Sequence, residues 1–377
     1  MKRMVFQSIL PLCLAALASG CGESSEERLA RADAGLASNR FADARAELQA
    51  ALRDDPENAE AMDKLARVYL QLGDPVAAIG MLDRMAAARK QPDDAPELYG
   101  EGYVMMGRFD LALGRVEDRQ GAAAHRVRAL AHIGRRETEL AAEAFAAGMR
   151  APGAKGPLLA DYAGFLMEQG DLDQAERIAA RAVAEKPAVL PAMLVNADLA
   201  VARGKPEEAL SWFERALETF PESRAALFGK LAALGQMKRI DELRPLLKQA
   251  LKDHPGELEF VFLEARLAAE TAQWGKVREI LQPFEGQMTG SSQASLLYSK
   301  ALIELGHAEE VRVKMLSQLL REPGNRGARA LLAEAQLATG DAATAIDTIR
   351  PLAESPEASA AERALLTQAL RVAAGGA

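Results

Sequence analysis

Apolar residues recur at helical spacing along most of the chain, in stretches of about a dozen residues separated by short polar turns. One pair of stretches shows the arrangement. Tyr69 follows Leu65 by four residues and Ala66 by three, and Ala78 and Leu82 repeat the four-residue spacing after a short gap. Such spacing places apolar side chains on one face of an amphipathic helix. The pattern therefore predicts two consecutive helices, each with one buried face.

Gly73 and Asp74 stand between these two predicted helices. Glycine readily adopts the left-handed conformation that ends a helix. Aspartate accepts a hydrogen bond from the first turn of the helix that follows. The small side chains of Ala66 and Ala78 allow the two helices to approach closely. The segment is therefore predicted to fold as a helical hairpin.

The hairpin pattern repeats with a fixed period. Pro187, Pro221 and Pro255 are 34 residues apart, and Pro323 follows two further periods on. An unrelated helical bundle would not be expected to have four prolines separated by multiples of the same 34-residue period. Internal repetition of this length indicates stacked hairpins. The last stretch, Ala360 to Ala373, is expected to cover the end of the stack.

These hairpins resemble the tetratricopeptide repeat. The matching positions are Ala44, Leu48, Ala51 and Pro56; Ala78 and Leu82; Ala175, Ala182 and Pro187; and Ala209, Phe213, Ala216 and Pro221. The resemblance implies an all-α, right-handed α-solenoid of about ten hairpins over residues 28–356, with a capping helix and tail over 357–377. Between residues 93 and 156 the register slips, and helix pairs are expected around Gly107 and Gly134.

The composition supports a helical fold. Hydrophobic residues make up 49% of the 377 positions and charged residues 27%, whereas aromatic residues reach only 5%. Alanine and leucine dominate, and both favour helices over strands. The net charge is −8, and the sequence shows no cluster of basic residues of the kind that nucleic-acid binding requires. Nucleic acids are therefore excluded as partners.

The first 20 residues have the pattern of a signal peptide. Lys2 and Arg3 precede an uncharged, mostly apolar run from Met4 to Ala18. This run has signal-peptide length and is short for a membrane-spanning helix. A plain secretory peptide and an uncleaved anchor helix remain alternatives to a lipoprotein leader.

Leu17-Ala-Ser-Gly-Cys21 resembles a bacterial lipobox. The resemblance implies cleavage before Cys21 and acylation of that cysteine, with residues 21–27 as an acylated tether. The chain has two cysteines, and Cys13 would leave with the leader, so Cys21 would have no disulfide partner. By the sorting pattern of enteric bacteria, Gly22 implies an outer-membrane lipoprotein that faces the periplasm.

Catalytic motifs are missing from the sequence. The four histidines are scattered over different repeats, and the chain has neither a Cys-x-x-Cys pair nor a phosphate-binding glycine loop. Carboxylate pairs such as Glu207-Glu208 fall at predicted helix starts, where they complement the helix dipole. We therefore expect a non-enzymatic protein without catalytic residues, metal or cofactor.

In solenoids of this family the first helix of each hairpin lines a concave groove. One groove position, followed through the 34-residue period, falls on apolar side chains, and so does a second position seven residues later. The predicted partner-binding residues are Leu194, Phe228, Phe262, Leu296, Val201, Ile303 and Leu337, with Gly235 and Ala269 at the second position. The alternative is that these side chains pack within or between hairpins. The earlier repeats carry charged residues instead, at Asp63, Arg67, Glu97 and Glu101, which suit a polar partner or none.

Together these features predict a non-catalytic scaffold that binds envelope proteins in its groove and is held on the membrane by lipid. The combination resembles lipoproteins of exopolysaccharide export systems. Pilus or secretion assembly and outer-membrane assembly are the alternative machines. Direct binding of polysaccharide is a second candidate function, although glycan sites usually need exposed aromatic side chains and the chain has only two tryptophans, Trp212 and Trp274.

Overall fold

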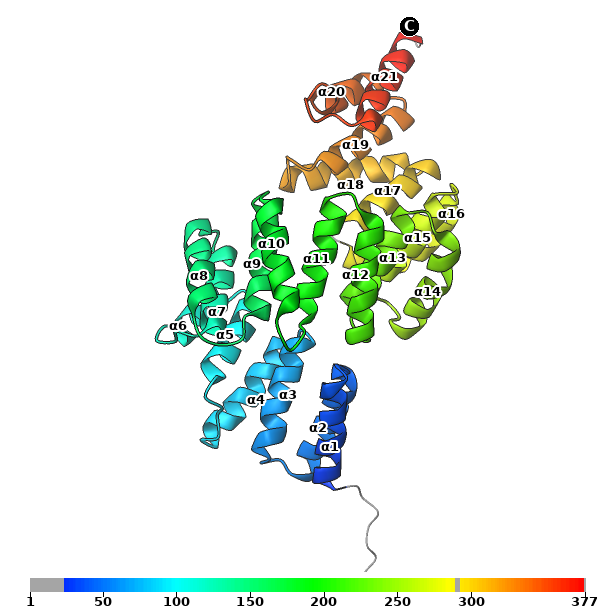
Figure 1. Ribbon diagram of the computed structural model, residues 1–377. Helices are drawn as coiled ribbons and strands as arrows, with labels where there is room; N and C mark the ends of the chain where they lie inside the picture. The colour runs from blue at the N-terminus through cyan, green and yellow to red at the C-terminus, as the bar shows by residue number, and fades with distance from the viewer. Residues whose placement is uncertain (1–23, 289–291, 376–377) are drawn as a thin grey trace, which may run out of the picture. The chain divides into compact units, whose positions relative to one another are not determined.

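The computed structural model describes residues 24–288 and 292–375 (Figure 1). Within these ranges the regular structure is entirely helical, with 21 α-helices, one short 3-10 helix and no strand. Within each of two compact units, helices that follow one another in the chain pack side by side. This arrangement confirms the predicted all-α array of hairpins.

The chain divides into two compact units, and the division passes through α12. The first unit runs up to Arg203 and includes Ser211–Ser223, and the second consists of Gly204–Leu210 and the chain from Arg224. The first eleven helices are α1 (Ser25–Ala37), α2 (Phe41–Asp54), α3 (Ala59–Gln71), α4 (Pro75–Ala87), α5 (Ala95–Met105), α6 (Phe109–Arg115), α7 (Ala122–Gly134), α8 (Thr138–Arg150), α9 (Gly156–Glu168), α10 (Leu172–Ala184) and α11 (Leu190–Ala202).

The remaining elements are α12 (Pro206–Thr219), α13 (Arg224–Gln236), α14 (Ile240–Asp253), α15 (Leu258–Ala269), α16 (Trp274–Leu281), η1 (Gln282–Gln287), α17 (Gln293–Glu304), α18 (Ala308–Arg321), α19 (Arg326–Ala338), α20 (Ala342–Ala353) and α21 (Ala360–Gly375). Odd-numbered helices up to α19 are the first helices of hairpins, and even-numbered helices are the second.

The hairpin of α3 and α4 forms as the sequence predicts. Gly73 ends the first helix with a φ of +78°, in the left-handed region. The Asp74 carboxylate accepts a hydrogen bond from the Ala77 N–H at 3.0 Å and so caps the second helix. Ala66 and Ala78 have no exposed surface, because the two helices pack closely at these small residues.

Helix α1 begins earlier than the sequence indicated. Ser24 accepts a hydrogen bond from the Glu27 N–H, and the Glu27 carboxylate accepts one from the Ser24 N–H, which forms a capping box. Part of the predicted tether, residues 21–27, is therefore the first turn of a helix. The predicted leader, residues 1–20, and Cys21 lie outside the described residues.

The helix pair predicted around Gly134 forms as α7 and α8, and its turn falls just after the glycine. Gly134 is the last residue of α7, and Arg136 takes the left-handed conformation, with a φ of +63°. A Cβ on Gly134 would lie 2.1 Å from the Phe109 ring. The glycine is thus explained by close packing of an aromatic ring against the helix.

The first unit brings together segments that are far apart in the sequence. The Asn39 side chain donates a hydrogen bond to the Thr219 carbonyl at 2.9 Å. The Ala42 N–H donates to the Glu222 carboxylate at 2.7 Å. The turn of the first hairpin therefore contacts the end of α12, across 180 residues of chain.

The final helix, α21, closes the second unit. Its Leu365, Leu366 and Ala369 pack on apolar side chains of α19 and α20. At its start, Glu362 accepts hydrogen bonds from the Arg326 guanidinium, at 2.7 Å for the shorter, and from the Ser359 N–H. Apolar packing and the ion pair between Glu362 and Arg326 therefore hold the helix that the sequence predicted as a cap.

Candidate functional site

The predicted groove residue Phe228 lines a cavity in the second unit. Its half-buried ring lies edge-on to the ring of Phe260, with centroids 6.5 Å apart. The cavity has a volume of about 250 Å³, and Arg224, Glu257 and Glu259 line its polar side. Arg224 and Glu257 form an ion pair with each other. A partner that entered the cavity would therefore contact the aromatic rings beside this matched pair of charges.

The other predicted residues of the second unit pack more deeply. Phe262 and Leu296 are half-buried and contact the apolar cluster that includes Val261 and Tyr298. Ile303 belongs to that cluster and is only 8% exposed. Leu337 is half-buried against a smaller cluster beneath α21. These side chains build the wall between hairpins, and their role in binding stays a prediction.

A larger cavity lies one period beyond Leu296, at Ala330 on α19. Its volume is about 520 Å³, and Leu331 and Leu365 provide much of its apolar lining. Alanine at this position leaves room that a longer side chain would fill. This site was not predicted from the sequence, because its signal is a small side chain at a register position where the neighbouring repeats have large apolar ones.

The charges around this second cavity are matched by one another. Lys300 forms ion pairs with Glu304, at 2.7 Å, and with Glu334. Arg326 pairs with Glu362 at 2.7 Å, and this hydrogen bond lowers the pKa of Glu362 to about 2. A ligand therefore need not neutralise any of them, and the cavity suits an apolar side chain, which gains most from leaving water.

Two predicted residues, Leu194 and Val201, lie on α11 in the first unit. Val201 is 44% exposed, and Leu194 is half-buried. An exposed valine on a first helix is available to a partner, although single exposed apolar side chains are common on protein surfaces. Nothing in their surroundings assigns these two residues to a site.

The charged first helices of the first unit pair among themselves. Arg67 binds Asp63 at 3.1 Å and Asp94 at 2.8 Å. Glu97 binds Arg119 at 2.7 Å, as a further pair of the same kind. A partner that competed for these groups would have to replace existing ion pairs, although the second carboxylate oxygen of Glu97 is buried without a hydrogen-bond partner among the described residues.

Arg126 makes the most buried of these contacts. It bridges Asp161 on α9, at 2.5 Å, and Glu101 on α5, at 3.1 Å, and its side chain is 18% exposed. Burial alone would lower the pKa of Arg126, but the two carboxylates outweigh it and raise the pKa. The bridge ties the first helices of three successive hairpins together.

No group of three metal-binding side chains is close enough to hold an ion in the part of the chain that the structure describes. Across those same residues, no helix has the length and apolarity needed to cross a bilayer. His132, one of the four histidines, is paired with Glu137 at 2.6 Å.

Family comparisons identify the repeats. Sequence models described as tetratricopeptide repeat match residues 35–100, 166–224, 194–242 and 327–351. The chain carries tetratricopeptide repeats. The matched segments fall in both units, and the segments without a match also consist of consecutive helices. Tetratricopeptide arrays commonly present an extended surface to partner proteins. No curated protein matches the chain.

Several solved structures match the chain. The APC/C hetero-tetramer Cut9-Hcn1 matches with a TM-score of 0.50 and 11% identity, over 92% of this chain and 96% of that one. Yeast Tom70 matches with a TM-score of 0.49 and 11% identity, over 93% and 96%. A thermophilic TPR protein of Thermus thermophilus is 23% identical, with a TM-score of 0.33, over 56% and 99%. Identity this low supports the fold alone, and the first match carries that support.

Proposed function

We propose that this protein is a non-catalytic scaffold that binds partner proteins through the first-helix face of its second unit. The observation that carries the proposal is the cavity over Ala330, in the register of the predicted groove. Its volume of about 520 Å³ accommodates one or two large side chains, and its surrounding charges are already paired. The Phe228 cavity offers a second, aromatic contact in the same unit.

Filling the cavity tests this proposal. Ala330→Phe places a ring where the partner side chain would sit, and it should reduce capture of crosslinked envelope proteins by roughly tenfold. The matched control is Ala343→Phe, an exposed position on α20 that lines no described cavity. Circular dichroism of both variants checks that the helices persist. Equal protein capture by Ala330→Phe and the control, or recovery of polysaccharide without protein, would reject the proposal.

We further propose that the scaffold is a lipoprotein of the outer membrane that faces the periplasm and serves an exopolysaccharide export machine. The support is the lipobox-like sequence before Cys21 and the resemblance of a lipobox followed closely by tetratricopeptide repeats to lipoproteins of such systems. Two acyl chains on one cysteine would give stable anchoring, which a single chain does not.

Cys21→Ala tests the anchor separately from the groove. The variant should either remain an unprocessed precursor or leave the membrane fraction, because the acylated residue is gone. Fractionation and mass measurement of the N-terminus check this outcome. A mature-length variant that stays on membranes would show that lipid on Cys21 is not the anchor.

A further inference from the structure

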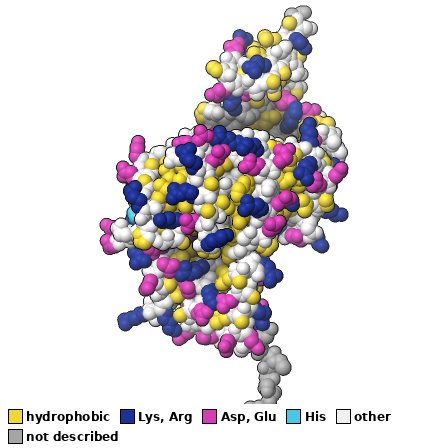
Figure 2. Space-filling view, in the orientation of Figure 1, with side chains coloured by type: hydrophobic (Ala, Val, Ile, Leu, Met, Phe, Trp, Pro, Cys, Tyr) yellow, Lys and Arg dark blue, Asp and Glu magenta, His cyan; other side chains and the backbone are white. Residues whose placement is uncertain are grey.

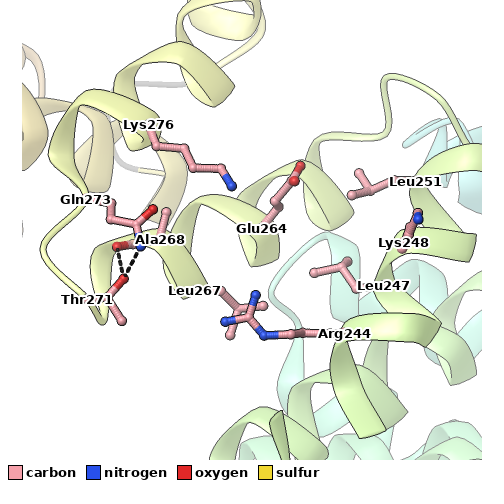
Figure 3. Close-up of a pocket in the computed structure, with 10 residues that line it drawn as sticks. All are labelled: Arg244, Leu247, Lys248, Leu251, Glu264, Leu267, Ala268, Thr271, Gln273 and Lys276. Atoms are coloured by element: carbon pink, nitrogen blue, oxygen red, sulfur yellow. Dashed lines mark hydrogen bonds between the residues drawn. The ribbon is translucent and has the colours of Figure 1, made fainter. Parts of the chain in front are cut away.

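A third concave site lies in the second unit, formed by α14, α15, α16 and the turn between the last two (Figure 3). Its volume is about 450 Å³. Leu247 and Ala268 form a buried floor, and Leu251 and Leu267 extend it at the sides. The site is therefore a hollow with an apolar floor, large enough for a substantial side chain.

Three basic side chains surround this floor. Arg244 and Lys248 come from α14 and Lys276 from α16, and all three are exposed. Among the described residues, none of the three forms an ion pair, and neither does Glu264, the carboxylate of the pocket. On the face in Figure 2, basic and acidic side chains are interspersed, whereas this pocket gathers three cations around one carboxylate. The pocket thus holds a local positive charge that the protein itself leaves unmatched.

The pocket does not belong to the predicted groove. Successive residues of an α-helix are about 100° apart, so the pocket residues Glu264 and Leu267 lie about 140–200° around α15 from Phe262. Two second helices, α14 and α16, form its sides. The groove position Phe262 and the pocket therefore occupy opposite faces of one helix.

The cations are not a general feature of the repeat. One period before and after Lys276, the chain has Glu242 and Glu310. One period before Lys248 it has Glu214. Arg244 does have a basic counterpart one period on, at Arg278. The hairpins form in the neighbouring repeats with glutamate at the positions of Lys248 and Lys276, so packing does not account for these two lysines.

We propose that this pocket binds an acidic segment of a partner protein and takes one of its large apolar side chains onto the floor. The negative net charge of the chain repels acidic segments in general, and the three unpaired cations reverse that field locally. A flat membrane surface cannot reach the floor of a hollow, so an extended peptide is the occupant that fits both the charge and the shape. This interaction surface goes beyond the scaffold's groove.

The test measures binding of a fluorescent peptide of about twelve residues, composed of glutamate, aspartate and leucine, to the purified protein by anisotropy. The variant Arg244→Glu with Lys248→Glu should weaken binding by roughly tenfold or more, and added salt should weaken binding to the unaltered protein. Lys276→Ala provides a milder second variant. The matched control is Lys252→Glu with Arg371→Glu, which changes net charge equally at two exposed positions outside the pocket.

Unchanged affinity in the double variant, an equal loss in the matched control, or equal binding of a peptide with lysine in place of the acids would overturn the proposal. Binding of anionic lipid vesicles without binding of the acidic peptide would also overturn it. The readout is independent of partner capture by the groove. Failure here therefore leaves the Ala330 experiment intact, and failure of that experiment leaves this one intact.

Discussion

Gly100, in the middle of α5, lies in tight packing between hairpins. A Cβ at this position would lie 2.7 Å from one methyl carbon of Val127 and 3.3 Å from a methyl carbon of Val116. Both valines are almost fully buried and are stiff about their first side-chain torsion, so neither can move aside cheaply. Gly80, in the middle of α4, has no atom within 4 Å of the equivalent point. The two glycines therefore allow the same substitution in opposite environments.

Replacement of glycine by alanine inside a helix stabilises it by about 1 kcal/mol. Gly80→Ala should gain about that amount, because its new methyl group meets open space. Gly100→Ala should gain the same stabilisation from helix propensity, but its new methyl group should cost about 2–3 kcal/mol through overpacking. We therefore expect Gly100→Ala to lower the free energy of unfolding by about 1–2 kcal/mol, and the two variants to differ by about 2–3 kcal/mol.

Urea unfolding followed by circular dichroism measures this difference. Repeat arrays can unfold in more than one step, so the transition that includes α3 to α7 is the one to compare. Hydrogen exchange of the amides in α5 and α7 assigns that transition. If Gly100→Ala is as stable as Gly80→Ala, the close approach of α5 to Val127 is not a constraint, and the packing argument fails.

Other contacts give further predictions. Arg126→Met should destabilise the first unit by about 2–3 kcal/mol in urea unfolding, because Glu101 and Asp161 lose a largely buried partner; a neutral result would show that the bridge is dispensable. Glu362 should make the docking of α21 sensitive to acid. Its folded pKa of about 2 lies below its ordinary value of 4.5, so its stabilising contribution is present above pH 4.5 and is lost as the pH falls toward 2. Hydrogen exchange in α21 across that range should show the loss, and Glu362→Gln should show a flatter profile; identical profiles would refute the role of the clamp with Arg326.

The sequence determined the repeat because the repeat is a local property. Apolar spacing within each helix, the glycine and aspartate at turns such as Gly73-Asp74, and the 34-residue phase of the prolines are all set within one hairpin and its neighbour. A solenoid is stabilised mainly by contacts between adjacent repeats, so local patterns are sufficient to predict it. At Gly134 the sequence predicted the helix pair but not the exact position of its turn, because glycine serves equally for a turn and for close packing, and its sequence context does not distinguish the two.

Only the tertiary structure decided which side chains remain available. Ile303 and Phe228 have the same apolar character in the sequence, yet one is buried in a cluster and the other lines a cavity. The physical reason is that availability depends on what neighbouring helices cover. The cavity at Ala330 and the unpaired cations around Leu247 both lie where side chains from three helices come together. The residue pattern of any one helix does not show which side chains of the other two will lie beside it.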